Sequence, residues 1–330
     1  MYEPKDDADW LLYELGGLHR AQVLSTLAAL GVPDELQKLG TASVQQLAGS
    51  LHCNEADLES LLRAAAGLGC LDEETPRHFT LTAKGEQLCR NKLGDFATFL
   101  GAKTQWNAWP GLRDSMRDDV DTTPFTRAFG NDLYAFLRQN PAAANEYDAA
   151  IDAFTRYEAA HVVERLDLSQ RQSLVDVGGG RGTLLVELLK KASAARGILF
   201  DLPHVAAEFE GTLPDRIDVV AGDFFESVPA GSDVYFLKHI LHNWDDERAA
   251  KILQNCKAAK AAGGIVVVID ALLYPDNRPD LARMMDLEMR VLCGGRERRK
   301  PEIRRLFADA GLSLERVEEL TPSSWLFVAS

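Results

Sequence analysis

Apolar residues in the C-terminal half of the chain fall in short runs separated by polar and glycine-rich stretches. These runs lie within residues 173–177, 196–203, 217–225, 233–238 and 264–272. Each is too short for a helix and is rich in Val, Ile, Leu or Phe, which is the pattern of buried strands. The stretches between them are long enough for helices. This alternation predicts an α/β domain built on a doubly wound, mostly parallel sheet. Two last runs, 314–320 and 325–329, predict an antiparallel hairpin at its edge.

The N-terminal third has a different pattern, with apolar residues at helical spacing. Leucines between residues 8 and 30 predict a helix that ends at Gly31-Val32-Pro33. A short helix is expected at 41–48, and Asn54 is a good N-cap for a further helix over 55–67. Two short strands, at 69–73 and 78–82, would follow. Helices followed by a two-stranded wing predict a winged-helix module.

The middle of the chain, residues 95–170, reads as mostly helical and carries many aromatic residues. We therefore expect three parts: a winged-helix-like module over 1–100, a helical linker over 101–170 and an α/β domain over 171–330. A length of 330 residues accommodates more than one hydrophobic core. Most of the aromatic residues are expected to fill those cores.

A winged helix raises the alternative of a transcriptional regulator, and charge argues against it. The whole chain has a net charge of −14, and residues 1–100 hold 8 Lys and Arg against 15 Asp and Glu. The expected recognition helix, 55–67, is itself acidic. Because phosphate contacts dominate DNA affinity, an acidic reading helix is a poor DNA-binding element. We expect no nucleic-acid partner and favour a subunit interface in a homodimer.

Composition also bears on location and on metals. The N-terminus is acidic and has no apolar segment typical of a signal peptide. The apolar run 265–269 is far too short to cross a bilayer. Five scattered cysteines without a C-x-x-C pair fit a reduced, cytoplasmic chain. No cluster of His, Cys and Asp with metal-ligand spacing stands out, so we predict no metal site.

The strand at 173–177 leads into a glycine loop that suggests a cofactor. Gly178, Gly180 and Gly182 are spaced G-x-G-x-G and follow Asp176, whereas the dinucleotide fingerprint G-x-G-x-x-G would need glycine at Thr183. This departure disfavours a nicotinamide dehydrogenase. A glycine turn before a helix lets backbone N–H groups approach a ligand closely. The pattern resembles motif I of class I S-adenosylmethionine methyltransferases.

Other polar residues fall where the predicted strands end. Asp201 ends the second strand, where a carboxylate can accept hydrogen bonds from ribose hydroxyls. Asp223 and Phe224 follow the third strand and could meet an adenine, and residues 238–242 follow the fourth. Ligands of such sheets lie beyond the carboxyl ends of the strands. The agreement of these independent positions predicts one cofactor site.

Taken together, these stretches closely resemble the S-adenosylmethionine-dependent O-methyltransferases that include plant caffeic acid and isoflavone enzymes, hydroxyindole O-methyltransferase, and bacterial phenazine and anthracycline enzymes. The stretches that carry the resemblance are Val175 to Gly182, Phe200 to Pro203, Gly222 to Phe225, Leu237 to Glu247 and Gly294 to Arg298. It covers essentially the whole chain and implies S-adenosylmethionine as cofactor and S-adenosylhomocysteine as product. With it, residues 1–100 are expected to be a dimerisation domain, the linker 101–170 to contribute to the substrate pocket, and 171–330 to be the catalytic domain that binds S-adenosylmethionine. It also implies that Gly178, Gly180, Asp201, Asp223, Phe224 and Lys238 bind the cofactor.

The resemblance further implies a catalytic pair. His242, in Leu-His-Asn-Trp, matches the family's general base, and Glu297, in Gly-Arg-Glu-Arg, matches the acid that orients it. A phenol has a pKa near 10, so a positioned base that removes its proton is worth roughly 10²–10⁴-fold in rate. His239 is the rival candidate for the base, or could contact the substrate.

The acceptor is expected to be a hydroxyl on a planar aromatic small molecule. The residues that could line its pocket are Phe154, Tyr157, His239, Met285 and Met289. Leu292-Cys293 depart from the Asn-Pro of the plant enzymes, which leaves the identity of the acceptor open. The alternative within the same fold is a member with altered chemistry, such as N-methylation, decarboxylation or hydroxylation.

Overall fold

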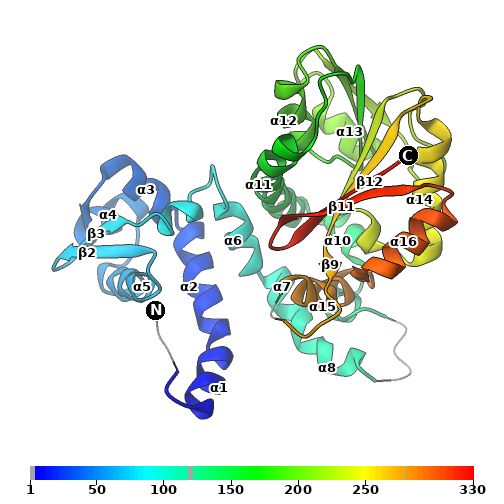
Figure 1. Ribbon diagram of the computed structural model, residues 1–330. Coiled ribbons are helices and arrows are strands. Elements are labelled where there is room, and N and C mark those ends of the chain that lie inside the picture. Colours follow the sequence, from blue (N-terminus) through cyan, green and yellow to red (C-terminus); the bar gives the residue numbers. More distant parts are fainter. Residues whose placement is uncertain (1–3, 118–121, 279) are drawn as a thin grey trace. The chain divides into compact units, whose positions relative to one another are not determined.

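The computed structural model describes residues 4–117, 122–278 and 280–330. The chain divides into two compact units, coloured by sequence in Figure 1. The first unit comprises Met1–Trp106 and Asn140–Tyr157, and the second comprises Asn107–Gln139 and Glu158–Ser330. The segment 101–170, predicted as a linker, is therefore shared between the two units.

The first unit is helical with a small sheet. Its elements are α1 (Asp7–Leu15), α2 (Gly17–Ala29), α3 (Val32–Leu39), β1 (Ala42–Ser43), α4 (Val44–Leu51), α5 (Glu55–Gly67), β2 (Leu71–Thr75), β3 (His78–Leu81), the 3-10 helix η1 (Gly85–Leu88) and α6 (Gly94–Leu100). The strands pair in the order β1-β3-β2. A core of buried Leu, Val and Ala side chains joins α2 to α5 and the sheet.

Local sequence explains where these helices begin. Asn54 caps α5 as predicted, because its side chain accepts from the backbone N–H groups of Ala56 and Asp57. Ser43 caps α4 in a capping box with Gln46. The single helix predicted for 8–30 is instead two helices, since Gly16 separates α1 from α2. Adjacent glycines weaken a helix at that point.

The second unit is built on a seven-stranded sheet. Its strands are β4 (Ser173–Val177), β5 (Arg196–Asp201), β6 (Ile217–Ala221), β7 (Val234–Lys238), β8 (Ile265–Asp270), β11 (Leu314–Thr321) and β12 (Ser324–Ala329). They lie in the order β11-β12-β8-β7-β4-β5-β6. β4 to β8 are parallel, and β12 pairs antiparallel with β8. The predicted doubly wound sheet and its edge hairpin are confirmed.

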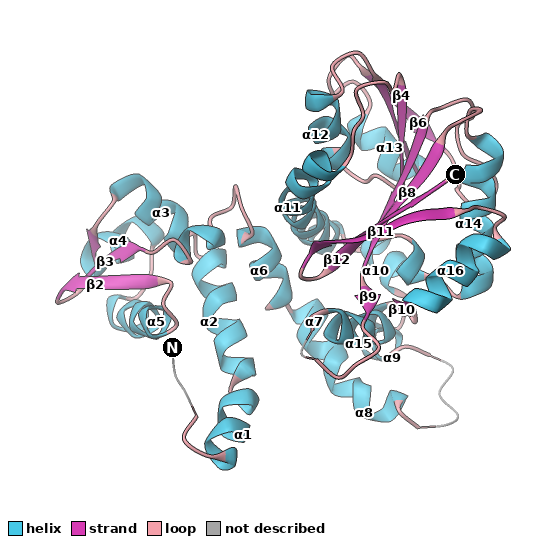
Figure 2. Cartoon of the chain, in the orientation of Figure 1, coloured by secondary structure: helices cyan, strands magenta, loops and turns pink. Residues whose placement is uncertain are grey.

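Helices cover both faces of this sheet, as Figure 2 shows for the second unit. The helices that lie wholly within this unit are η2 (Trp109–Gly111), α8 (Leu112–Ser115), α9 (Pro124–Phe129), α10 (Leu133–Gln139), α12 (Thr183–Lys191), α13 (Pro203–Phe209), η3 (Leu241–Asn243), α14 (Asp246–Ala259), α15 (Ala282–Leu292) and α16 (Lys300–Asp309). α7 (Lys103–Ala108) and α11 (Pro141–Arg165) each have residues in both units. A short parallel pair, β9 (Leu272–Leu273) and β10 (Arg298–Arg299), completes the unit.

Successive residues of the central strands belong to two different cores. In β7, Tyr235 and Leu237 pack with α14 and α16, whereas Val234 and Phe236 pack with α12 and the end of α11. Strand side chains alternate between faces, so a sheet covered on both faces needs an unbroken apolar run. In β4, β5, β7 and β8 an acid or a lysine stands at the last or next-to-last position, namely Asp176, Asp201, Lys238 and Asp270. That edge, beyond β4, β5, β7 and β8, carries the candidate site.

Candidate active site

The glycine loop after β4 has the backbone that a close ligand approach requires. Gly178 and Gly180 have φ angles of +70° and +55°, a region that glycine adopts without steric cost. A Cβ on Gly178 would lie 2.7 Å from Cδ1 of Ile240, whereas one on Gly180 would meet nothing within 4 Å. The loop therefore packs tightly at Gly178, against Ile240 after β7, and has unoccupied space beside Gly180.

Asp201, at the end of β5, is bonded directly to this loop. Its Oδ2 accepts the Gly180 N–H at 2.9 Å and its Oδ1 accepts the Leu202 N–H at 2.7 Å. Burial raises the pKa of Asp201, and these two backbone hydrogen bonds oppose that rise. A carboxylate has about four lone-pair sites, so each oxygen can still accept from a hydroxyl of a ligand.

Asp176, at the turn between strand and loop, is a second buried acid. Its Oδ2 has no hydrogen-bond partner among the described residues. Burial, with the nearby charge of Asp201, raises the pKa of Asp176 to about 7 against the opposing effect of Lys238. A buried polar atom without a partner is costly, which indicates a group that a ligand satisfies. This orphaned oxygen and the open glycine loop fit the cofactor expected from the sequence.

Asp223 and Phe224 follow β6 at the same edge. Asp223 Oδ1 accepts the Phe225 N–H at 2.8 Å, which fixes the turn. Phe224 packs edge-on against Phe225 and Trp244, with ring centroids 4.8 and 6.2 Å apart. Phe224 also lies beside Gly178, since a Cβ there would be 3.6 Å from its ring. The structure thus brings the predicted adenine residues to the glycine loop.

The predicted catalytic pair is in contact. His242 lies in η3, the turn after β7, and its Nδ1 is 2.8 Å from Oε1 of Glu297. Both side chains are buried. The two residues are 55 positions apart in the chain. The short strand pair β9–β10 brings the segment of Glu297 to the sheet, because Arg298 pairs with Leu272, which follows β8. If Nδ1 donates to the carboxylate, Nε2 keeps its lone pair and can accept a proton.

The turn that carries His242 is held by the segment around Glu297. The Arg296 N–H donates to the His242 carbonyl at 2.8 Å. The buried Arg298 guanidinium donates to the carbonyls of Leu241 and Trp244, and it pairs with Asp246 at 2.8 Å. These contacts explain why Gly-Gly-Arg-Glu-Arg accompanies the histidine motif.

Gly295 leaves no room for a side chain in this arrangement, and we expect Gly295→Ala to displace the base. A Cβ at that position would lie 2.1 Å from the His242 carbonyl oxygen and 2.9 Å from Cα of Asn243. Relief of this overlap requires backbone movement, for which we expect a loss of about 1–3 kcal/mol in the free energy of unfolding. Thermal denaturation measures the effect, with Gly49→Ala as control because a Cβ on Gly49 meets nothing within 4 Å. Equal melting temperatures for the two variants would contradict the described packing.

The contacts that the structure describes for His239 are with a different acid from the partner of His242. Nε2 of His239 is 2.9 and 3.1 Å from the two carboxylate oxygens of Glu158, which is fully buried in α11. Nζ of Lys238 lies 3.2 Å from the same carboxylate. The cofactor contact predicted for Lys238 and the substrate contact predicted for His239 therefore stay predictions.

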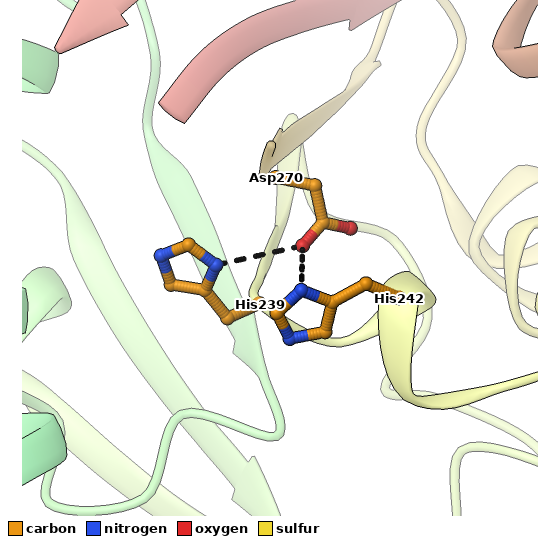
Figure 3. A group of neighbouring side chains, drawn as sticks. All are labelled: His239, His242 and Asp270. Atoms are coloured by element: carbon orange, nitrogen blue, oxygen red, sulfur yellow. Dashed lines mark ion pairs between the residues drawn. The ribbon is translucent and has the colours of Figure 1, made fainter. Parts of the chain in front are cut away.

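Asp270, the last residue of β8, lies between the two histidines (Figure 3). Its Oδ1 is 3.6 Å from Nδ1 of His239 and 3.5 Å from Nδ1 of His242. The sequence did not single out Asp270 or Glu158. Asp270 ends an apolar strand as Asp201 does, so the same argument could have found it. Glu158 lies within a long helix, where no local pattern distinguishes it.

The residues predicted for the acceptor pocket fall in both units. Met285 and Met289 lie on α15 in the second unit, and Cys293 Sγ lies 3.5 Å from Oδ1 of Asn243, so α15 ends beside the turn that carries His242. Phe154 and Tyr157 lie in the first unit, where Phe154 stacks on Phe96 with centroids 4.9 Å apart. Whether any of these four residues contacts the acceptor stays a prediction. Across the described residues, no helix has the length and apolarity needed to cross a membrane.

Comparison with known proteins identifies two domains in the chain. Residues 109–313 match an O-methyltransferase domain and residues 14–91 match an O-methyltransferase dimerisation domain. The chain is 36% identical to a 3-amino-4-hydroxybenzoate 4-O-methyltransferase from Streptomyces cremeus, over 98% of this chain and 91% of the relative. It is 34% identical to the phenazine O-methyltransferase PhzM of Lysobacter antibioticus, over 93% and 91% of the two chains. The solved structure of CalO1, a methyltransferase of calicheamicin biosynthesis in its SAH-bound form, superposes with a TM-score of 0.86 at 29% identity, covering 100% and 99% of the two chains.

Proposed function

The chain belongs to the S-adenosylmethionine-dependent O-methyltransferases of specialised metabolism, and we propose that it methylates a hydroxyl on a planar aromatic molecule with His242 as general base. The observation that carries the proposal is the 2.8 Å contact between His242 Nδ1 and Glu297 Oε1. An acid beside a histidine selects one tautomer and stabilises the imidazolium that forms. A domain that only bound a nucleotide would have no use for a buried histidine in contact with a buried acid.

In this mechanism each group has one task. S-adenosylmethionine supplies the methyl group when it is bound. Nε2 of His242 accepts the proton of the acceptor hydroxyl, since a phenol is mostly protonated at neutral pH. Glu297 keeps the other ring proton on Nδ1 and balances the positive charge that develops. The backbone hydrogen bond from Arg296 to His242 fixes the turn, so the base does not have to be ordered during the reaction.

The cofactor residues are proposed on their position at one edge of the sheet. Gly178 and Gly180 would line S-adenosylmethionine, Asp201 would accept from its ribose, and Asp223 with Phe224 would meet the adenine. The free lone pairs of Asp201 and the open side of Gly180 support these roles. Lys238 would contribute positive charge at the same edge. The domain roles predicted for 1–100, 101–170 and 171–330 are proposed with them.

The acceptor class is proposed from relatives. Curated relatives are named for methylation of 3-amino-4-hydroxybenzoate and of phenazines, and others for mitomycin and puromycin precursors. A hydroxyl on a flat aromatic ring is common to the first two. We therefore propose such an acceptor, with Met285, Met289, Phe154, Tyr157 and His239 as the residues to examine for contact.

Mass spectrometry of products tests this proposal. The purified protein is incubated with S-adenosylmethionine and a panel containing 3-amino-4-hydroxybenzoate, hydroxyphenazines, flavonoids and anthraquinones. The gain of one methylene mass on a hydroxylated member is the expected result. Decarboxylated or oxygenated products, or methylation only at nitrogen, would instead establish the altered-chemistry alternative.

We also propose that the protein is a homodimer through its first unit. Large apolar side chains are exposed on α1 and the start of α2, with Leu12 and Leu15 exposed to 68% and 66%. A contiguous apolar surface of this kind is typical of a subunit interface.

Replacement of this surface is expected to give a monomer. In Leu12→Asp/Leu15→Asp two charges would be buried without partners, so association should weaken by at least about 10²-fold. Sedimentation equilibrium measures the change, and Leu39→Asp, on α3 of the same unit, is the exposed control. A variant that sediments as the unmodified protein does would place the interface elsewhere.

A further inference from the structure

Both ring nitrogens of His239 face carboxylates. Nε2 lies 2.9 Å from Glu158 and Nδ1 lies 3.6 Å from Asp270. A neutral imidazole has one N–H, whereas the imidazolium has two, so that one can donate to Glu158 while the other faces Asp270 as an ion pair at a distance beyond a hydrogen bond. Glu158 is fully buried, and a buried carboxylate needs a positive partner. The geometry therefore favours a His239 that is charged at neutral pH.

The charges around His239 agree with this state. Among the contacts that the structure describes, the charged or titratable groups that face it are Glu158 on α11, Asp270 at the end of β8, the preceding residue Lys238 at the end of β7, and His242 in η3. Burial alone would lower the pKa of His239, but the Glu158 carboxylate outweighs burial and Lys238 and raises that pKa to about 9. Burial likewise opposes ionisation of Glu158, yet His239 and Lys238 lower its pKa to about 2.

Asp270 lies close to both His239 and the proposed base His242. The rings of His239 and His242 stack at 5.2 Å with an interplanar angle of 24°, and Asp270 Oδ1 is nearly equidistant from both. One carboxylate balances one positive charge. An imidazolium at position 239 therefore satisfies Asp270 and disfavours a second positive charge on His242.

We propose that His239 is a positioning residue: its imidazolium, held by Glu158, balances Asp270 and so leaves His242 uncharged with Glu297 as its orienting acid. The inference rests on the proposed role of His242 as base. His239 acts only through this electrostatic contact with Asp270 and His242.

The backbone keeps His239 in place at a steric cost. Its φ angle is +54°, a region that residues with a Cβ rarely adopt. The His239 N–H donates to the Ile269 carbonyl at 2.8 Å, and Nδ2 of Asn243 donates to the His239 carbonyl at 3.0 Å. Strain of this kind persists where surrounding contacts fix the residue, as at functional sites.

The same three side chains could hold a metal ion, since one donor atom from each lies within 4.8 Å of the others. A cation there would need the lone pairs of both Nδ1 atoms. Nδ1 of His242 is already shared with Glu297, and a charged His239 has no lone pair to offer. A charged His239, with Nδ1 of His242 in contact with Glu297, therefore accounts for these contacts without a metal ion.

The charge state is tested without any acceptor by nuclear magnetic resonance of histidine-labelled protein saturated with S-adenosylhomocysteine. The His239 signal is assigned as the one missing from His239→Gln. We expect it to show the imidazolium form from pH 6 to about pH 8 and to become neutral near pH 7 in Glu158→Gln. A neutral His239 at pH 7 in the unmodified protein would overturn the inference, as would a tight Zn²⁺ complex that His239→Gln abolishes.

The effect on the base is tested by the pH dependence of kcat/KM, with the panel member that the unmodified protein methylates. His239→Gln and His239→Lys share the backbone strain and similar length but differ in charge. We expect the acid limb to move upward by about one pH unit in His239→Gln, because the base is then protonated up to a higher pH. His239→Lys should keep the limb near its original position. If kcat/KM fell by the same factor at every pH in both variants, His239 would have only a structural role and the proposal would be wrong. Absence of methyl transfer by the unmodified protein would instead refute the proposed function, and the spectroscopic result would still decide the state of His239.

Discussion

His242→Ala is expected to lower kcat for a phenolic acceptor by at least about 10³-fold while the affinity for S-adenosylhomocysteine changes by no more than a few fold. The variant removes the imidazole whose Nδ1 contacts Glu297, and with it the group that is proposed to accept the proton of the acceptor hydroxyl. The proposed cofactor contacts lie on the glycine loop and Asp201, whose hydrogen bond the substitution leaves intact. The loss should therefore fall on the chemical step and not on cofactor binding.

Two comparisons make this prediction specific. Glu297→Gln keeps the shape of the acid but removes its charge, so we expect a smaller loss, about 10²-fold, in kcat. His78→Ala, at an exposed position of β3 in the first unit, should leave kcat unchanged. Steady-state kinetics give kcat, and calorimetry gives the affinity for S-adenosylhomocysteine. Near-normal turnover by His242→Ala would remove the base assignment.

Asp201→Ala is expected to have the opposite signature, with cofactor affinity lost first. The carboxylate accepts backbone hydrogen bonds from Gly180 and Leu202, and it is proposed to accept from the ribose hydroxyls. Hydrogen bonds to a charged group contribute about 1.5–3 kcal/mol each. Loss of the ribose contacts, together with release of the glycine loop, should weaken S-adenosylmethionine binding by about 10²-fold or more.

The control for this variant is Asp218→Ala, on the neighbouring strand β6. Asp218 is largely exposed and pairs only with the exposed Arg196 among the contacts that the structure describes, so its loss should have little effect. Isothermal titration with S-adenosylmethionine measures both. Equal affinity of Asp201→Ala and the unmodified protein would refute the ribose role.

The sequence was most informative where polar residues follow the predicted strands directly. The doubly wound sheet followed from apolar runs, and the polar residues at their ends predicted a single edge. The contact of His242 with Glu297 could not follow from spacing, because the two residues are distant in the chain and meet only through β9 and β10. The family resemblance supplied that pair, and the structure places it in hydrogen-bond contact.

The sequence was least informative where a residue acts through tertiary contacts alone. Glu158 lies on a helix that has no clear apolar face, and its partners Lys238 and His239 lie on a different element. His239 was considered only as a rival base or a substrate contact. Its pairing with two acids emerged only from the fold, because burial decides which charges must be balanced.

Methyl transfer from S-adenosylmethionine with a deuterated methyl group tests the central claim most directly. The unmodified protein and His242→Ala are compared on the hydroxylated aromatic that the panel identifies, and fragmentation in the mass spectrometer locates the label. We predict that the label appears on the acceptor oxygen with the unmodified protein and is lost with His242→Ala. Label on another atom, or equal labelling by both proteins, would contradict O-methylation with His242 as the base.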